Sequence, residues 1–256
     1  MSNKRRIAAI ALVICLAAAG WAGYMGVSEL LERKSGVDYY AELAAEVRAA
    51  AVSAAVTPEP TAALLDALQD ALLPLVFDAL RVSFPDIVGW ISIEGTAIDY
   101  PVVQGVDNDF YLTHLPDKNK NSAGSIMMDV SCDPAFGCAV TILHGHHMRS
   151  GAMFGDLDLY LEDGYYEEHP AMLLKTPDGN FNVEIFAATI VNGREYGYLT
   201  SFRNEEEFDD FMTELREGSA FESDVEVSFG DRMLMLSTCE YTYDDARLLV
   251  VGKIVE

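Results

Sequence analysis

The fold is decided near the C-terminus, by the stretch Met233-Leu234-Met235-Leu236-Ser237-Thr238-Cys239-Glu240. Its apolar residues are typical of a buried strand, and that strand would end by presenting a single cysteine. A turn-like Tyr-Asp-Asp follows, and a second apolar strand begins at Arg247 and runs to Val255. A thiol at the end of one strand and a guanidinium at the start of the next suit nucleophilic acyl chemistry. This interpretation requires a histidine elsewhere in the chain.

Outward from this stretch, the chain from Phe84 onward has the pattern of short strands separated by turns. We expect strands over residues 88–93, 97–103, 124–129, 139–144, 171–175 and 181–191, in addition to the two at the C-terminus. A helical turn is expected over 107–112, an amphipathic helix over 153–161 and an acidic surface helix over 204–216. Many short strands with few helices predict a mostly β protein that forms a closed or nearly closed β-barrel.

The N-terminus has the pattern of a membrane anchor. Lys4, Arg5 and Arg6 precede an uncharged, mainly apolar run over residues 7–27. About twenty such residues span a bilayer as a helix, and the basic cluster favours a cytoplasmic N-terminus. A cleaved signal peptide is the alternative, because Ala17-Ala18-Ala19 offers small residues to a peptidase; the length of the run favours a retained anchor. The sequence thus predicts a single-pass type II membrane protein whose catalytic domain is extracellular.

Domain boundaries follow from this pattern. Residues 1–6 would be a cytoplasmic tail, 7–27 the transmembrane anchor and 28–60 a helical stalk that ends in a Pro-rich linker. Residues 61–83 are expected to form an N-terminal packing helix, which Pro74 should kink or restart. Residues 84–256 would form the catalytic β-barrel domain.

Composition excludes some functions and leaves others open. The chain carries 17 basic and 41 acidic side chains, a formal charge of −24. Nucleic-acid binding needs a basic footprint, so the balance argues against it. Cys132 and Cys138 bracket a short loop and could pair, although their spacing alone does not show a disulfide. Cys239 then has no evident partner, which is notable in an exported protein.

Three histidines cluster after the expected strand over 139–144: His144, His146 and His147. A strand end followed by glycine is a common way to present a side chain to a cleft. Close-set histidines also bind zinc, but this cluster lacks a convincing carboxylate or second-cluster partner, and alternate residues of a strand point to opposite faces. We therefore expect neither a metal nor a cofactor.

From Phe84 to the end, the chain resembles a known family in a series of short segments. The matching segments are Pro85-Asp86-Ile87-Val88-Gly89-Trp90-Ile91, Ile98-Asp99-Tyr100-Pro101-Val102-Val103-Gln104, Asp107-Asn108 with Tyr111-Leu112, Gly124-Ser125-Ile126-Met127-Met128-Asp129, Gly145-His146-His147, Met153-Phe154 and Leu236-Ser237-Thr238-Cys239. In order and spacing, the chain resembles a class B sortase, a cysteine transpeptidase of Gram-positive cell surfaces. The resemblance implies a sortase-type closed eight-stranded β-barrel with added helices.

The resemblance also assigns roles to residues. Cys239 would be the nucleophile, His146 the general acid–base and Arg247 the cation beside the oxyanion. Substrate-pocket positions of the family fall on Asn108, Leu112, Tyr198, Leu199, Ser237 and Glu240.

The implied function is transpeptidation at the outer face of the membrane. The enzyme would cleave a C-terminal sorting signal of Asn/Ser-Pro-x-Thr type after Thr, and would join the secreted protein to lipid II or a peptidoglycan stem-peptide amine. One alternative is pilin polymerisation, in which a pilin lysine is the acceptor, and another is simple hydrolysis. A surface-anchored binding module is the non-enzymatic alternative, and it would leave the Cys-His-Arg set unexplained.

Overall fold

The structure, a computed structural model, describes residues 31–46 and 62–255. The expected cytoplasmic tail, the anchor and the Pro-rich linker lie outside these residues. Among the helices within them, none combines the length and the apolar character needed to cross a bilayer.

Eight strands close into a mixed barrel, as expected from the sequence. They are β1 (Ile87–Ser92), β2 (Asp99–Val103), β3 (Ile126–Met128), β4 (Val140–His144), β5 (Ala171–Thr176), β6 (Gly179–Asn192), β7 (Met233–Cys239) and β8 (Ala246–Val255). Around the barrel their order is β1-β2-β3-β4-β7-β8-β6-β5. The pairs β2–β3 and β4–β7 are parallel and the others are antiparallel. Two strands far apart in sequence, β4 and β7, therefore run side by side in the same direction.

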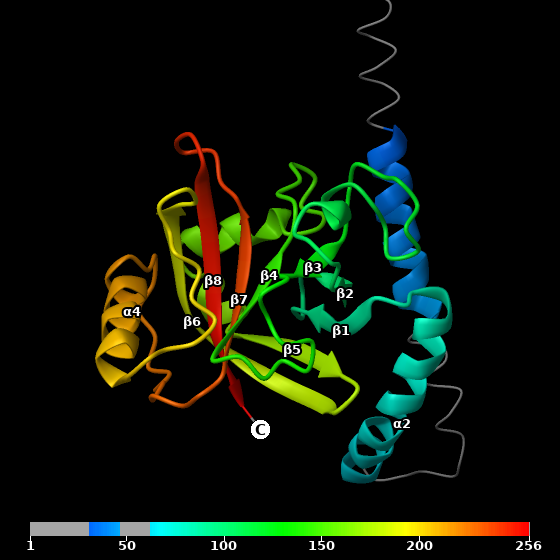
Figure 1. The fold of residues 1–256 in the computed structure, drawn as a ribbon, viewed down its shortest axis with the longest axis horizontal. Coiled ribbons are helices and arrows are strands. Elements are labelled where there is room, and N and C mark those ends of the chain that lie inside the picture. Colours follow the sequence, from blue (N-terminus) through cyan, green and yellow to red (C-terminus); the bar gives the residue numbers. More distant parts are fainter. Residues whose placement is uncertain (1–30, 47–61, 256) are drawn as a thin grey trace, which may run out of the picture.

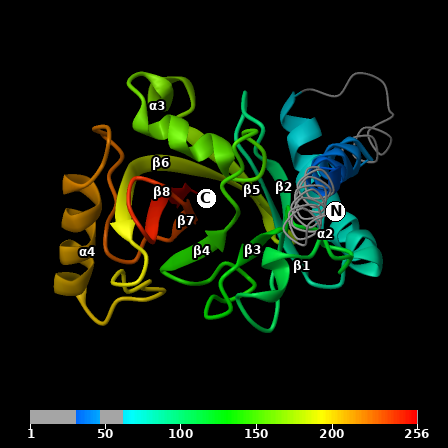
Figure 2. The same ribbon diagram turned by 90° about the horizontal axis from the view of Figure 1, so that it is seen from above.

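Helices cover two opposite sides of this barrel (Figures 1 and 2). A helix over residues 31–46 and α2 (Ala62–Ser83) lie on one side, and α4 (Glu205–Glu217) lies on the other. The short elements are η1 (Phe110–Leu112), η2 (Gly155–Leu161) and α3 (Tyr165–Glu168). Helix α2 is continuous across Pro74, so of the expected kink or restart the restart does not occur. The amphipathic helix expected over 153–161 is instead the 3₁₀ helix η2.

Local sequence explains where α4 begins and which face it buries. The Asn204 side chain caps the helix by accepting a hydrogen bond from the backbone N–H of Glu207 at 2.9 Å. Phe208, Phe211 and Leu215 recur at helical spacing and are buried against the barrel. The acidic residues between them face solvent, as the sequence predicts.

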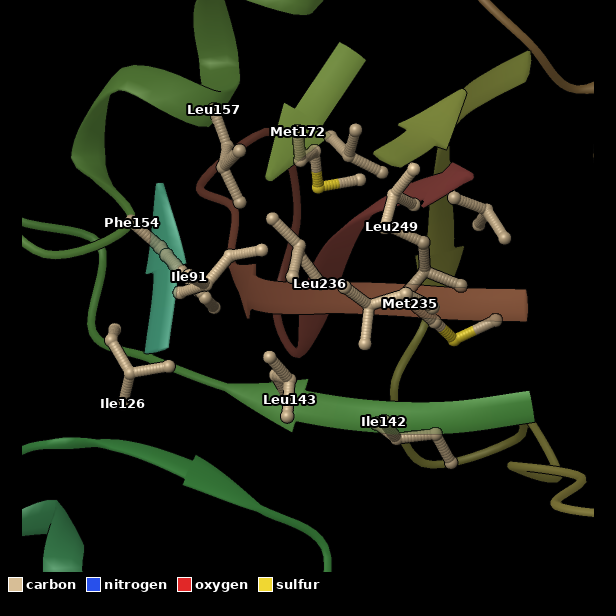
Figure 3. Close-up of a cluster of buried hydrophobic side chains, with 14 of the residues drawn as sticks. Ile91, Ile126, Ile142, Leu143, Phe154, Leu157, Met172, Met235, Leu236 and Leu249 are labelled. Atoms are coloured by element: carbon tan, nitrogen blue, oxygen red, sulfur yellow. The ribbon is translucent and has the colours of Figure 1, made fainter. Parts of the chain in front are cut away.

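The core lies inside the barrel (Figure 3). Leu143 of β4, Leu236 of β7 and Leu249 of β8 are fully buried there. Each such side chain contributes roughly 1.5–3 kcal/mol of transfer free energy. Packing on both faces of β7 explains why its sequence is apolar without alternation.

Candidate active site

The C-terminal end of β7 presents Cys239 beside Arg247. The first six residues of the strand are buried, and the cysteine that ends it is half-buried. Across the antiparallel pair β7–β8, Cys239 lies directly opposite Arg247. Side chains at opposite positions share one face of a sheet, with Cβ atoms about 5 Å apart. The strand pairing therefore places the Cys239 and Arg247 side chains at neighbouring positions on one face of the sheet.

The parallel pair β4–β7 brings His146 to the other side of Cys239. Its register aligns His144 with Ser237. Two residues further along the sequence from this aligned pair, His146 lies just beyond the end of β4 and Cys239 is the last residue of β7. Cys239 and Arg247 thus come from the neighbouring strands β7 and β8, and His146 comes from the segment just beyond β4, the other neighbour of β7.

Hydrogen bonds hold the segment after β4 against β7. The backbone N–H of Gly145 donates to the Ser237 carbonyl at 3.2 Å, and the Thr238 hydroxyl donates to the Gly145 carbonyl at 2.9 Å. On the far side of the segment, the Phe154 N–H donates to the carbonyl of His146 at 3.0 Å. The backbone on both sides of the histidine is therefore fixed.

A single hydrogen bond determines which nitrogen of the His146 ring carries the hydrogen. Its Nε2 lies 2.7 Å from the carbonyl oxygen of Leu112, the last residue of η1. Because a carbonyl only accepts, Nε2 carries a hydrogen and donates it. In the neutral ring, Nδ1 is then the nitrogen that can take a proton.

The Arg247 side chain packs against Gly193, just beyond β6. A Cβ built on Gly193 would stand 2.7 Å from Cγ of Arg247 and 3.4 Å from its Nε. The Gly193 N–H donates to the Asp245 carbonyl at 2.9 Å, and the Asp245 carboxylate pairs with Arg194 at 2.7 Å. Arg247 itself donates from Nη1 to the Ala246 carbonyl at 3.0 Å. Position 193 therefore requires glycine, because any side chain there would clash with the side chain of Arg247.

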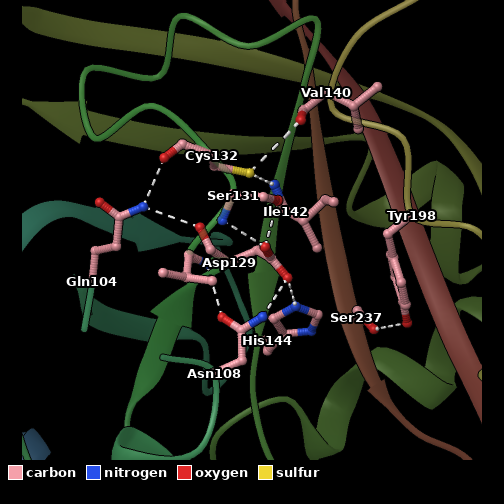
Figure 4. Close-up of polar contacts among 11 residues, drawn as sticks. Gln104, Asn108, Asp129, Ser131, Cys132, Val140, Ile142, His144, Tyr198 and Ser237 are labelled. Atoms are coloured by element: carbon pink, nitrogen blue, oxygen red, sulfur yellow. Dashed lines mark hydrogen bonds and ion pairs between the residues drawn. The ribbon is translucent and has the colours of Figure 1, made fainter. Parts of the chain in front are cut away.

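Two of the expected substrate-binding residues contact each other. The hydroxyls of Tyr198 and Ser237 are 2.9 Å apart (Figure 4). The Tyr198 ring also packs edge-on against the ring of His144, at 5.6 Å between centroids. Burial raises the pKa of Tyr198, so this phenol stays protonated and serves as a neutral hydrogen-bonding group.

Asn108, a third expected substrate-binding residue, is tied to Asp129 (Figure 4). Its Nδ2 donates to Asp129 Oδ2 at 2.8 Å, and its Oδ1 accepts from the Val130 N–H at 2.8 Å. Asp129 also accepts from His144 Nε2 at 3.0 Å, and from the Ser131 hydroxyl at 2.6 Å. The His144 contact, helped by Ser131, holds the pKa of Asp129 well below its usual range although burial acts the other way.

The remaining expected substrate-binding residues lie apart from one another. Leu112 is half-buried, and its carbonyl is the group that holds His146. Leu199 lines a cavity of about 250 Å³ against α4. Glu240 follows Cys239 and accepts from the Thr242 N–H at 2.7 Å. Burial would raise the pKa of Glu240, but its hydrogen bonds with Thr242 outweigh burial and lower it.

The three clustered histidines point to different partners. His144 contacts Asp129, His146 contacts Leu112, and His147 contacts Asp158 at 3.1 Å. Within 31–46 and 62–255, no three histidine, cysteine or acidic side chains are grouped as metal ligands.

The disulfide left open by the sequence is not formed, since Cys132 and Cys138 are both free thiols. Burial raises the pKa of Cys132 to about 12, and the adjacent Cys138 adds to the shift.

Comparison with known proteins agrees with this arrangement. The family model described as the sortase domain matches residues 91–255. The chain belongs to the sortase family. It is 38% identical to sortase B of Listeria monocytogenes over 66% of this chain and 70% of that protein. It is 35% identical to sortase B of Staphylococcus aureus over 70% of this chain and 75% of that protein.

Solved structures extend the likeness to three dimensions. A Staphylococcus aureus sortase B–substrate complex matches with a TM-score of 0.76 and 29% identity, over 88% of this chain and 99% of that one. The expected family, class and enzyme type are confirmed: the chain is a sortase B-type cysteine transpeptidase. The domain boundaries and the roles of individual site residues stay predictions.

Sequence reasoning missed the residues that support the site of this sortase. Asp129, Gly193 and Thr238 were not among the expected site residues, yet they contact Asn108, Arg247 and the segment that carries His146. Asp129 ends one of the matching segments, which was the available signal. Thr238 also lies in a matching segment, whereas Gly193 acts only through contacts between segments far apart in sequence, which no local pattern shows.

Proposed function

We propose that this sortase cleaves a C-terminal sorting signal of Asn/Ser-Pro-x-Thr type after Thr, through a thioester on Cys239. It then transfers the secreted protein to an amine of cell-wall peptidoglycan. The observation that carries the proposal is the strand pairing, which sets Cys239 opposite Arg247 across β7 and β8 and brings the segment just beyond β4, which carries His146, alongside the end of β7. The solved Staphylococcus aureus sortase B–substrate complex, whose fold this chain shares, supports a role in substrate binding.

In the first step, the Cys239 thiol gives its proton to Nδ1 of His146 and the thiolate attacks the Thr carbonyl carbon. A C–S bond forms and the carbonyl electrons move onto oxygen. Arg247 stabilises that charge with fixed donors that do not lose a proton. The C–N bond then breaks as the imidazolium protonates the leaving amine. The products are the thioester and the released C-terminal peptide.

In the second step, the acceptor amine attacks the thioester carbon and loses a proton to His146. A C–N bond forms, the C–S bond breaks, and the sulfur leaves as a thiolate that His146 can reprotonate. The Leu112 carbonyl holds Nε2 throughout, which leaves Nδ1 free to exchange protons with sulfur and amine.

We also propose that residues 7–27 anchor the enzyme as a type II membrane protein with the catalytic domain outside the cell. The uncharged run and the preceding basic residues support this orientation. Protease treatment of intact cells tests it: the barrel should be digested only if it is exposed outside.

Mass spectrometry of the acyl-enzyme tests the chemistry. Incubation with a panel of sorting peptides should add the mass of the N-terminal fragment, ending in Thr, to Cys239. Cys239→Ala should remove the adduct and leave the circular dichroism spectrum unchanged. Cleavage that persists in Cys239→Ala contradicts the proposal, and product formed only with a pilin lysine would assign pilin assembly instead.

A further inference from the structure

A cleft of about 980 Å³ lies between the helix over residues 31–46 and the barrel. Three further segments line it: the β1–β2 turn, the segment that follows His146, and the segment that follows Cys239. In Figure 2 the helix stands beside β2, away from α4. The cleft is thus separate from the cavity that Leu199 lines against α4.

Chain neighbours of the two residues that exchange protons in the proposed mechanism line this cleft. His147, which follows His146, and Tyr241, two residues after Cys239, both line it. Their rings contact each other edge-on at 5.2 Å between centroids. A ligand in the cleft would therefore contact residues that lie one position from His146 and two positions from Cys239 in the chain. The expected sorting-peptide residues Tyr198 and Asn108 do not line it.

The charge of the cleft is opposite to that of the chain. Arg33, Lys34 and Arg149 line it, whereas Asp99 is the one carboxylate among its described lining residues. Asp99 Oδ1 already accepts a hydrogen bond from the Trp90 indole at 2.6 Å. In a chain of formal charge −24, a cleft whose described lining carries three cations and one carboxylate favours an anionic ligand.

The aromatic walls of the cleft are fixed before any ligand binds. The Tyr40 hydroxyl donates to the Gly124 carbonyl at 2.6 Å, and the Tyr100 hydroxyl accepts from the Met153 N–H at 2.9 Å. The two rings also pack edge-on at 5.2 Å. Binding therefore does not have to order this wall, which lowers the entropic cost of association.

We propose that the cleft binds the acceptor of the second step, and that Arg33, Lys34 and Arg149 hold carboxylates of that acceptor while its amine reaches the Cys239 thioester. The proposal rests on the transpeptidase function proposed above and names its second substrate as an acidic, amine-bearing peptide. A peptidoglycan stem peptide brings an amine and free carboxylates together. A lysine within a folded pilin brings no terminal carboxylate, so the charge of the cleft favours the cell-wall acceptor.

The test compares two acceptors that differ only in charge: a peptidoglycan stem tetrapeptide as the free acid, and the same peptide with every carboxylate amidated. The wild-type enzyme should show a lower KM for the acid. Arg149→Gln and the double variant Arg33→Gln/Lys34→Gln should each raise the KM for the acid about fivefold or more, because each loses charged contacts to it. The KM for the amidated peptide should not change.

A matched control and an independent nucleophile keep the outcomes distinct. Lys120→Gln removes one exposed positive charge outside the cleft, and it should leave both KM values unchanged. Hydroxylamine, which is small and neutral, should release the hydroxamate equally from wild type and all variants. Equal KM values for the two peptides in wild type, or an effect of Lys120→Gln as large as that of Arg149→Gln, would overturn the acceptor site. Failure of hydroxylamine to release any hydroxamate would instead overturn the thioester function.

Discussion

Gly193 lies so close to Arg247 that a single added methyl group would reach the arginine side chain, 2.7 Å from its Cγ. The backbone carbonyl of Asp245 is on the same side, 3.1 Å from that methyl position. The arginine side chain or the backbone around Gly193 would therefore have to move, and either change displaces Arg247 relative to this segment. Gly193→Ala should lower kcat/KM for thioester formation about ten- to a hundredfold, since small misplacements of a positioned group are costly.

Gly197→Ala is the matched control, because nothing lies within 4 Å of a Cβ at that position in the same segment. It should leave the rate unchanged. Stopped-flow measurement of peptide release checks both variants, and equal rates for them would contradict the role of Gly193.

Thr238 and Thr141 give a second matched pair, on neighbouring strands. Thr238→Val removes the hydrogen bond to the Gly145 carbonyl, and should cost about 1 kcal/mol of unfolding free energy and lower kcat, because His146 loses support. Thr141 is fully buried, and its hydroxyl has no partner among the described residues. Thr141→Val should therefore be neutral or stabilising. Urea unfolding measures both, and a reversed order of stability would refute this account.

Asp129 should contribute to stability through its hydrogen bonds to His144, Asn108 and Ser131. Asp129→Asn should lower the unfolding free energy by about 1–3 kcal/mol, because it leaves buried donors with a weaker partner. The exposed Asp109 serves as the control, and Asp109→Asn should change little. Equal effects of the two substitutions would show that the buried network contributes nothing.

The pH dependence of Asp129 follows from the direction of its pKa shift. Its folded pKa is depressed, so its contribution is present above the unfolded value of about 3.9 and is lost as pH falls through the folded value. The difference in unfolding free energy between wild type and Asp129→Asn should thus be full at pH 5 and shrink progressively below pH 4. If the difference in unfolding free energy between wild type and Asp129→Asn instead increased below pH 4, the pKa of Asp129 could not be lowered by folding, and this explanation would be excluded.

Cys132 should resist alkylation in the folded protein. Its side chain is buried and its pKa is raised to about 12, so the reactive thiolate is scarce at pH 8. After iodoacetamide treatment, peptide mass spectrometry should find Cys239 modified and Cys132 unmodified, and urea should abolish the difference. Rapid labelling of Cys132 without urea would contradict its burial.

Much of the fold follows from local pattern. The strands expected over 171–175 and 181–191 correspond to β5 and β6, and the apolar run that ends in cysteine predicts β7. The restart expected at Pro74 does not occur, because α2 is continuous across it. The closure of the barrel depends on β4 pairing with β7, which are separated by almost ninety residues of chain.

In the candidate active site too, local sequence pattern predicts contacts between neighbouring strands of the sequence but not contacts between distant ones. Cys239 and Arg247 are adjacent in an antiparallel pair, so their proximity can be predicted from a short stretch of sequence. The choice of His146 over His144 came from family resemblance, because the histidines share one pattern. The structure distinguishes them by their partners: His144 contacts a carboxylate, and His146 contacts a carbonyl. Those partners come from strands and loops that only the closed barrel brings together.

The parallel pairing of β4 with β7 has a consequence for export. The thiol at position 239 meets its imidazole only after a strand made early in synthesis and a strand made late have been laid side by side. An unfolded chain crossing the membrane would therefore carry an ordinary cysteine, without an activated nucleophile that could acylate the wrong peptide. The Cys239 thiol would therefore become reactive only after β7 has paired with β4, late in folding.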